Sequence, residues 1–152
     1  MTSSDMHVYV GVDPGASGAV AVINGKLEVV DLLKLKDATD REVYAIMECA
    51  AHLGAKGFIE RVHAMPKQGL SSTFKFGVSY GKLMMALAAA GVPYREVTPH
   101  KWQQSLGCLT KGDKNVTKRM AAQLFPDVKV THAVADALLI AEYARRIWGG
   151  AS

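Results

Sequence analysis

A short apolar run near the start of the chain, from His7 to Asp13, constrains the fold more than any other stretch. Valines alternate with other residues along it, and this alternation of β-branched side chains predicts a strand. Pro14 and Gly15 follow and should end the strand, because proline lacks an N–H donor and glycine tolerates a positive φ. Asp13 is therefore expected at the end of the first strand, where its simplest interpretation is a turn aspartate.

Two further strands follow closely, over residues 18–23 and 26–33. Asn24 and Gly25 separate them, a pair that favours a two-residue type I′ hairpin turn. The first three strands should therefore form an antiparallel meander.

A helix and a fourth strand come next. Thr39 and Glu42 have the spacing of a capping box, which predicts the start of a helix. The strand over residues 57–62 carries Glu60. Because a helix separates this strand from the meander, we expect it to pair in parallel with the first strand. Asp13 and Glu60 would then stand on neighbouring strands.

The remaining pattern alternates helix and strand without a linker or repeat. We expect a long helix from Ser71 or Ser72 to Ala90, a strand over 93–97, a short helix from Thr98, a basic helix capped by Asp113, and a last helix over 132–148. Residues 1–152 are thus predicted to form one α/β domain, with residues 1–6 flexible. Its five-stranded mixed sheet, an antiparallel meander plus parallel strands, would be flanked by helices.

Gly77 and Gly81 lie four residues apart on one face of the long helix, where they allow close backbone approach. Simple packing against the sheet explains part of this helix. The alternative for its exposed remainder is a contact between two copies of the chain.

Composition excludes several classes of protein. No apolar run approaches the length of a membrane span, and the first residues lack the pattern of a signal or transit peptide. The two cysteines, Cys49 and Cys108, form no CxxC pair, so neither a disulfide framework nor a zinc site is expected. We expect a cytoplasmic protein with no membrane partner. The net charge of +4 points weakly to nucleic acid.

The last predicted helix places Asp136 among alanine, valine and leucine. A carboxylate there needs a partner, because burial of an unpaired charge is costly. His132 lies one turn earlier on the same face. It could pair with Asp136, or Asp136 could face solvent near the helix start. Alternatively, this face points at the ends of the first and fourth strands and joins Asp136 to Asp13 and Glu60.

Three clustered carboxylates would repel one another unless cations neutralise them. Hard oxygen ligands suit Mg²⁺ or Mn²⁺. Two such ions about 4 Å apart can activate a water and stabilise the leaving oxygen of a phosphodiester. The expected ligands are Asp13, Glu60 and Asp136.

Six segments, in this order, resemble the RuvC-like Holliday junction resolvases, which have the ribonuclease H-like fold. They are GVDPGASGAVAV, IERV, FGVSYG, EVTPHKWQQSLG, KGDKNVTKRMAAQLFP and THAVADALLIAEYARR. The resemblance covers the chain from His7 to Trp148. Many bacterial members carry their last two ligands three residues apart. The spacing of four between His132 and Asp136 is more similar to the chloroplast and phage branch.

This resemblance implies an endonuclease that makes paired symmetric nicks in four-way DNA junctions, as a homodimer with two Mg²⁺ or Mn²⁺ ions per active site. It implies catalytic and metal-binding roles for Asp13, Glu60, His132 and Asp136, in which His132 would ligate a metal ion or assist the attacking water. A bacterial or phage origin fits better than an organellar one. Candidate DNA contacts are the lysines, for phosphates, and the segment after Glu60, near the branch point: His63, Met65, Lys67, Phe74, Lys75, Lys111, Lys114 and Lys118.

Other interpretations remain open. Met65 and Phe74 could cover the core rather than enter the junction, and Lys114 and Lys118 could form a solvated helix face. A ribonuclease acting on RNA–DNA hybrids would share the fold and the metal site. A catalytically silent junction-binding module is a further alternative. The sugar kinase and actin superfamily also follows its first strand with an Asp-x-Gly pattern, but needs a second half for which this chain is too short.

Overall fold

Five strands form one mixed sheet: β1 (Val8–Asp13), β2 (Ala19–Asn24), β3 (Val29–Lys34), β4 (Lys56–Glu60) and β5 (Tyr94–Val97). The computed structural model describes residues 3–150. The strand order is β3-β2-β1-β4-β5. β1 pairs antiparallel with β2, and β2 pairs antiparallel with β3. β4 pairs in parallel with both β1 and β5, so the predicted mixed sheet is confirmed.

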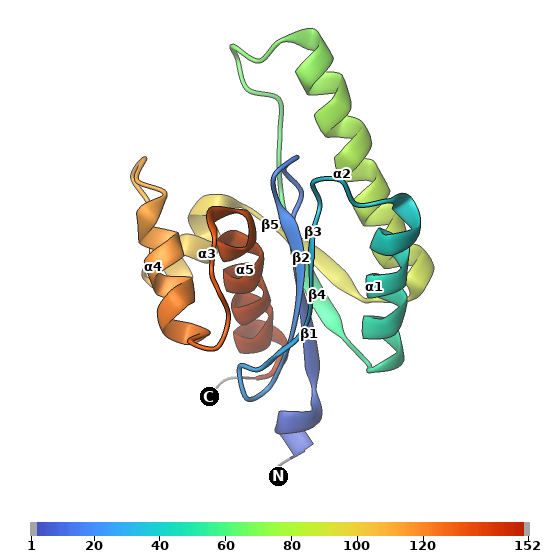
Figure 1. Cartoon of the computed structure of the whole chain (residues 1–152), viewed down its shortest axis with the longest axis vertical. Helices are drawn as coiled ribbons and strands as arrows, with labels where there is room; N and C mark the ends of the chain where they lie inside the picture. The colour runs from blue at the N-terminus through green and yellow to red at the C-terminus, as the bar shows by residue number, and fades with distance from the viewer. Residues whose placement is uncertain (1–2, 151–152) are drawn as a thin grey trace.

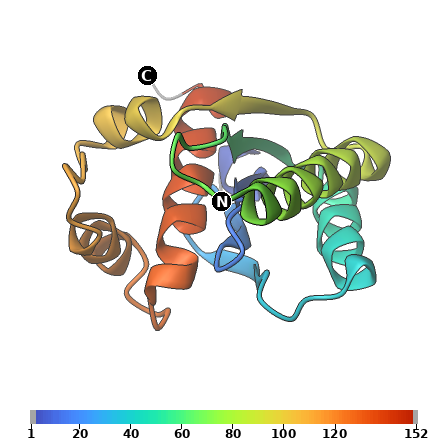
Figure 2. The same cartoon turned by 90° about the horizontal axis from the view of Figure 1, so that it is seen from above.

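Helices cover both faces of this sheet (Figure 1). They are η1 (Ser3–Met6), α1 (Asp40–His52), α2 (Leu70–Ala90), α3 (Pro99–Leu106), α4 (Asn115–Leu124) and α5 (His132–Trp148). Figures 1 and 2 show α1 and α2 on one side of the sheet and α3, α4 and α5 on the other. Residues 1–2, part of the segment predicted to be flexible, lie outside the described residues. In residues 3–150 no helix has the length and apolar character needed to cross a membrane.

Each face of the sheet has its own core, because side chains alternate between faces along a strand. In β1, Val8, Val10 and Val12 belong to the core beneath α1 and α2. Tyr9, from the same strand, belongs to the core beneath α5. A strand buried on both sides reads as a nearly continuous apolar run, which is why β1 and β2 are so evident in the sequence.

α5 packs directly against β1 through a glycine. A Cβ atom built on Gly11 would lie 2.2 Å from the backbone nitrogen of Ala141 and 2.3 Å from the carbonyl oxygen of Ala137. A side chain at position 11 would therefore displace the helix. This close approach places the first turn of α5 beside the carboxyl end of β1.

The hairpin between β2 and β3 differs from the predicted two-residue turn. Its loop is longer, with Leu27 at a φ of 64°. The Leu27 nitrogen donates to the Asn24 carbonyl oxygen at 3.2 Å. The Asn24 side chain accepts from the nitrogens of Lys26 at 2.9 Å and Glu28 at 3.0 Å. The type I′ prediction is wrong because Asn24 remains in β2 and its amide organises the loop that follows.

The predicted helix starts are confirmed where the N-cap side chain accepts a hydrogen bond from the backbone of the first turn. Thr39 and Glu42 form the expected capping box, and the Thr98 hydroxyl accepts from the Lys101 nitrogen. The prediction of Ser71 or Ser72 as the cap of α2 is wrong. Gly69 is the N-cap residue without a side-chain bond, and both serines already lie within the helix.

Two further boundaries shift by one or two residues. The N-cap of α4 is Lys114 rather than Asp113. The Asp113 side chain nevertheless accepts from the Asn115 nitrogen at 2.9 Å. β4 ends at Glu60 instead of continuing to residue 62.

The chain after β4 rises beyond the carboxyl edge of the sheet and returns as the first half of α2 (Figure 1). We call residues 61–78 the arm. Four large apolar side chains on it are exposed, namely Met65, Leu70, Phe74 and Val78. The buried residues of α2, Leu83 and Leu87, lie in its second half. The arm is therefore attached to the domain at its base, and these four apolar side chains are exposed.

Candidate active site

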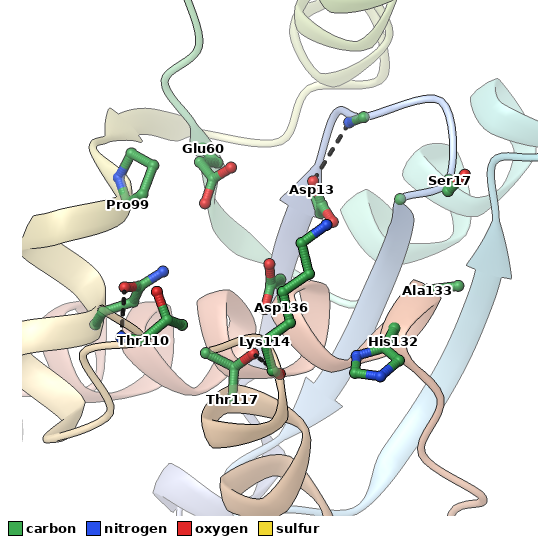
Figure 3. A pocket seen from close by; sticks show the side chains of 13 residues that line it. Asp13, Ser17, Glu60, Pro99, Thr110, Lys114, Thr117, His132, Ala133 and Asp136 are labelled. Atoms are coloured by element: carbon green, nitrogen blue, oxygen red, sulfur yellow. Dashed lines mark hydrogen bonds between the residues drawn. The ribbon is translucent and has the colours of Figure 1, made fainter. Parts of the chain in front are cut away.

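A pocket of about 400 Å³ lies at the carboxyl ends of β1 and β4. Asp13 ends β1 and Glu60 ends β4, and because these strands are parallel both residues reach the same edge of the sheet. His132 and Asp136 line the same pocket from the first turns of α5. Figure 3 shows the four side chains around one space. The structure thus brings together all four residues predicted to form the catalytic set.

Asp13 is held by the turn that follows it. The Gly15 nitrogen donates to Asp13 Oδ1 at 3.3 Å. The chain then passes so close that a Cβ atom on Gly18 would lie 2.9 Å from Asp13 Cγ and 2.1 Å from its carbonyl oxygen. Asp13 is therefore a turn aspartate and a pocket carboxylate at once.

Glu60 is held by a buried tryptophan. The indole nitrogen of Trp102, on α3, donates to Glu60 Oε2 at 2.8 Å. Trp102 is fully buried, as its spacing with Leu106 predicts. Its contact with Glu60 had no signal in the sequence, because the two residues meet only through the tertiary fold.

Asp136 faces α4. Burial raises the pKa of Asp136 above its ordinary value, although a hydrogen bond with the Thr117 side chain and the charges of Lys114 and His132 partly oppose this rise. Within residues 3–150 no ion pair joins His132 to Asp136. The simple pairing of these two residues is thus absent, and both side chains line the pocket.

Burial raises the pKa values of all three acids, and repulsion from the neighbouring acids adds to the rise at Asp13 and Glu60. Burial, followed by the charge of Asp136, raises the pKa of Asp13 to about 6. Burial raises the pKa of Glu60 to about 7, and the charges of Asp13 and Asp136 add to the effect. Burial also raises the pKa of Asp136. The three carboxylates therefore share one electrostatic environment that is short of positive charge.

α5 carries another buried acid whose charge is fully paired. Glu142 is 1 % exposed, and its oxygens accept from Arg145 Nε at 2.7 Å and Arg146 Nε at 2.8 Å. The chain therefore supplies cations for Glu142. It supplies much less for the pocket acids, where Lys114 extends toward Asp13 but forms no ion pair with it among the described residues (Figure 3).

This donor set fits a divalent cation. Carboxylate oxygens are the ligands that Mg²⁺ and Mn²⁺ prefer, and the nearby positive charges leave the pKa values of all three acids raised. In the described part of the chain no three acidic, histidine or cysteine side chains stand in a metal-binding arrangement. Binding by all three acids would therefore require their side chains to move closer together.

The residues predicted to contact DNA divide into two groups, the three lysines at and just before α4 and the five residues of the arm. Lys114 lines the pocket with the acids, whereas Lys111 and Lys118 lie outside it. The others lie on the arm, away from the pocket: His63, Met65, Lys67, Phe74 and Lys75.

Sequence reasoning missed several neutral residues that line the pocket, namely Ser17, Pro99, Gln103, Thr110 and Thr117. Thr117 offered a weak signal, because it is a polar residue beside the apolar stripe of α4. It is 4 % exposed. The other four have no pattern that separates them from ordinary loop and helix residues.

Comparison with known proteins identifies the fold. Neither a protein-family model nor a curated protein matches the sequence. Among solved structures, Thermus thermophilus RuvC matches with a TM-score of 0.66 and 21% identity, over 94% of this chain and 96% of that chain. T. thermophilus RuvC in complex with a Holliday junction substrate matches with a TM-score of 0.63 and 20% identity, over the same shares of both chains. The chain therefore has the fold of RuvC, the ribonuclease H-like fold that its sequence motifs predict.

Proposed function

We propose that this protein is a metal-dependent endonuclease that resolves four-way DNA junctions. The observation that carries the proposal is the pocket in which Asp13, Glu60 and Asp136 meet with too little positive charge. The pocket lies on the RuvC fold, and one of the similar solved structures is a complex with a Holliday junction substrate.

In this proposal Asp13 would be a ligand of both ions, and Glu60 and Asp136 would each be a ligand of one. Mg²⁺ or Mn²⁺ bound there would activate a water and stabilise the leaving oxygen of the phosphodiester. His132, which also lines the pocket, would orient the water or transfer a proton. Imidazole is a softer ligand than Mg²⁺ prefers, so a proton-transfer role suits His132 better than ligation.

We propose that the DNA is contacted by two surfaces. Lys111 and Lys118 lie outside the acidic pocket and would bind phosphates. The arm stands at the same edge of the sheet as the pocket (Figure 1). Its exposed side chains Met65 and Phe74, with His63, could enter the unstacked bases of a branch point.

A homodimer is part of the proposal. Leu70, Phe74, Gly81 and Met85 recur at helical spacing along one face of α2. The three apolar side chains are exposed, and a Cβ atom on Gly81 would have no neighbour within 4 Å. A junction has two-fold symmetry and must be cut twice, so a two-fold dimer with two pockets is the economical arrangement.

The decisive experiment is cleavage of an end-labelled four-way junction with Mg²⁺ or Mn²⁺, beside a linear duplex and an RNA–DNA hybrid. Wild type and Asp13→Asn are compared. We expect paired symmetric nicks in the junction, abolished by the substitution while binding persists. Binding without cleavage in either metal would indicate a silent junction-binding module. Cleavage of the hybrid alone would retain the fold and change the substrate.

The lysines can be tested through salt. Each phosphate contact contributes roughly −0.9 to the slope of log K against log salt concentration. We expect the Lys111→Ala, Lys118→Ala double variant to flatten this slope by about two contacts. An unchanged slope in the triple variant that also carries Lys114→Ala would remove all three lysines from the interface.

A further inference from the structure

The orientation of Glu60 depends on a neutral donor. Trp102 Nε1 donates to Glu60 Oε2 at 2.8 Å, and Glu60 lines the pocket. An indole N–H has no formal charge, so it can orient a carboxylate without cancelling its charge. A lysine or arginine in the same place would orient Glu60 and also compete with a bound cation.

The position of the indole is fixed by the core around it. Trp102 is 0% exposed and belongs to the same core as Leu106, Phe125 and Leu138. α3, which carries it, is short and is capped at both ends, by Thr98 at its start and by Gly107, at a φ of 72°, at its end. The direction of the indole N–H is therefore set by packing on α5 rather than by solvent.

The hydrogen bond from Trp102 to Glu60 connects a core residue to a pocket residue. A buried indole N–H without an acceptor is unfavourable, so Trp102 requires Glu60 as much as Glu60 requires Trp102. With Oε2 engaged by the indole, Oε1 remains for a ligand in the pocket. Carboxylates that bind metal are commonly oriented by such a hydrogen bond, and loss of the donor weakens metal binding.

We propose that Trp102 is a positioning residue that orients Glu60 for a divalent cation through its indole N–H. The inference rests on the proposed function for the identity of the ligand. It assigns to α3, which contributes no acid, a part in building the site.

The chain contains a matched control. It has two tryptophans, and Trp148 Nε1 donates to the carbonyl oxygen of Gly57 at 3.2 Å. Gly57 and Glu60 lie on the same strand, β4, near its opposite ends. Trp102→Phe and Trp148→Phe each remove one indole donor and keep an aromatic ring, but only the first removes a donor to a pocket carboxylate.

The test is titration of the DNA-free protein with Mg²⁺ by calorimetry, with the Tm of each variant measured in parallel. We expect Trp102→Phe to weaken Mg²⁺ binding about tenfold, and Trp148→Phe to leave it within about twofold of wild type. Junction cleavage by Trp102→Phe should recover at raised Mg²⁺ concentration. Wild-type affinity in Trp102→Phe, or equal weakening in both variants at equal Tm, would overturn the proposal.

A second measurement leaves Trp102 in place, in case Trp102→Phe does not fold. In Trp148→Phe the indole of Trp102 is the one that remains, and its Hε1 NMR resonance should shift and saturate as Mg²⁺ is added. A resonance unmoved at saturating Mg²⁺ would overturn the inference.

The outcomes separate the inference from the proposed function. Tryptophan-dependent Mg²⁺ binding without junction cleavage would keep the inference and reject the nuclease. Junction cleavage with equal Mg²⁺ affinity in wild type and Trp102→Phe would keep the nuclease and reject the inference. Wild-type protein that binds no Mg²⁺ would reject both.

Discussion

The two longest helices lie on opposite sides of the sheet and differ sharply in burial (Figure 2). α5 has 17 residues, ten of them buried. α2 has 21 residues, and its buried residues are Leu83 and Leu87. α5 is thus core and pocket wall at once, whereas α2 is attached near one end and exposes the rest. The α5 side of the sheet therefore contains the pocket acids. The α2 side carries a long helix whose first half is exposed to solvent.

Glycines show the same difference at the level of single atoms. At Gly11, under α5, a Cβ atom would lie 2.2 Å from a backbone nitrogen. At Gly77 and Gly81, on α2, a Cβ atom would meet nothing within 4 Å. The same substitution should therefore have opposite consequences on the two sides of the sheet.

Gly11→Ala should have the largest effect on stability. The new methyl group would collide with backbone atoms of α5, which cannot rotate away as a side chain can. We expect a loss of at least about 3 kcal/mol in the free energy of unfolding, or insoluble protein. Urea denaturation of Gly11→Ala beside Gly81→Ala measures the difference. Near-equal midpoints for the two variants would show that α5 does not pack this closely on β1.

The pocket acids should make stability fall as pH rises. The pKa of Asp13 is about 3.8 in the unfolded chain and about 6 in the folded chain. The pKa of Glu60 rises from about 4.5 to about 7. Between these values the folded state binds more protons than the unfolded state, so each step up in pH favours unfolding. In a chelating buffer we expect the Tm to fall by roughly 5 to 10 °C between pH 4.5 and pH 7.5.

Mg²⁺ should reverse most of that fall at pH 7.5 and have little effect at pH 4.5, where the acids are protonated. Asp13→Asn is the control, because it removes one of the titrating groups and should flatten the profile. A metal-free Tm that rises across the same pH range would contradict the described burial of the acids.

Gly81→Ala should have a smaller effect of opposite sign. Alanine is favoured over glycine within a helix by about 0.5–1 kcal/mol, and position 81 has room for it. We expect a slightly more stable chain and, if the proposed dimer forms through this face, weaker self-association, because the methyl group would hold the two copies apart. Analytical ultracentrifugation measures the association. Unchanged association would place the contact between copies elsewhere.

Leu70→Ser with Phe74→Ser should change stability least. Both side chains are largely exposed, at 91% and 73%, so the free energy of unfolding should stay within about 0.5 kcal/mol of wild type. Separate measurements of junction binding and of self-association then show whether the arm contacts DNA or a second copy of the chain. Loss of junction affinity alone indicates a DNA contact, and loss of association alone indicates a contact between copies. If neither changes, the arm has neither role.

The sequence predicted the fold well because the strongest patterns are local. β1 and β2 are apolar on both faces, and Thr39 and Glu42 form a capping box. The first half of α5 is apolar around nearly its whole circumference. The hairpin at Asn24 could not be predicted as well, since an asparagine can either enter a turn or organise one from the end of a strand.

The site was partly predictable for a related reason. Asp13 and Glu60 end strands, and Asp136 interrupts an apolar helix, so each is conspicuous in the sequence. The neutral residues that hold these acids are not. Trp102 reads as an ordinary core residue, and Thr117 as one more polar residue of α4. Their contacts depend on how α3 and α4 pack against α5, which no local pattern encodes.

The direct contact of α5 with β1 also bears on biosynthesis. Gly11 lies in the first strand of the described fold, and Ala137 and Ala141 lie in its last helix. Until that helix has left the exit tunnel, the side of β1 that it covers stays open, and Asp136 cannot join Asp13 and Glu60. The pocket can therefore form only after almost the whole of the described fold has been synthesised, because its acids come from both ends of that fold.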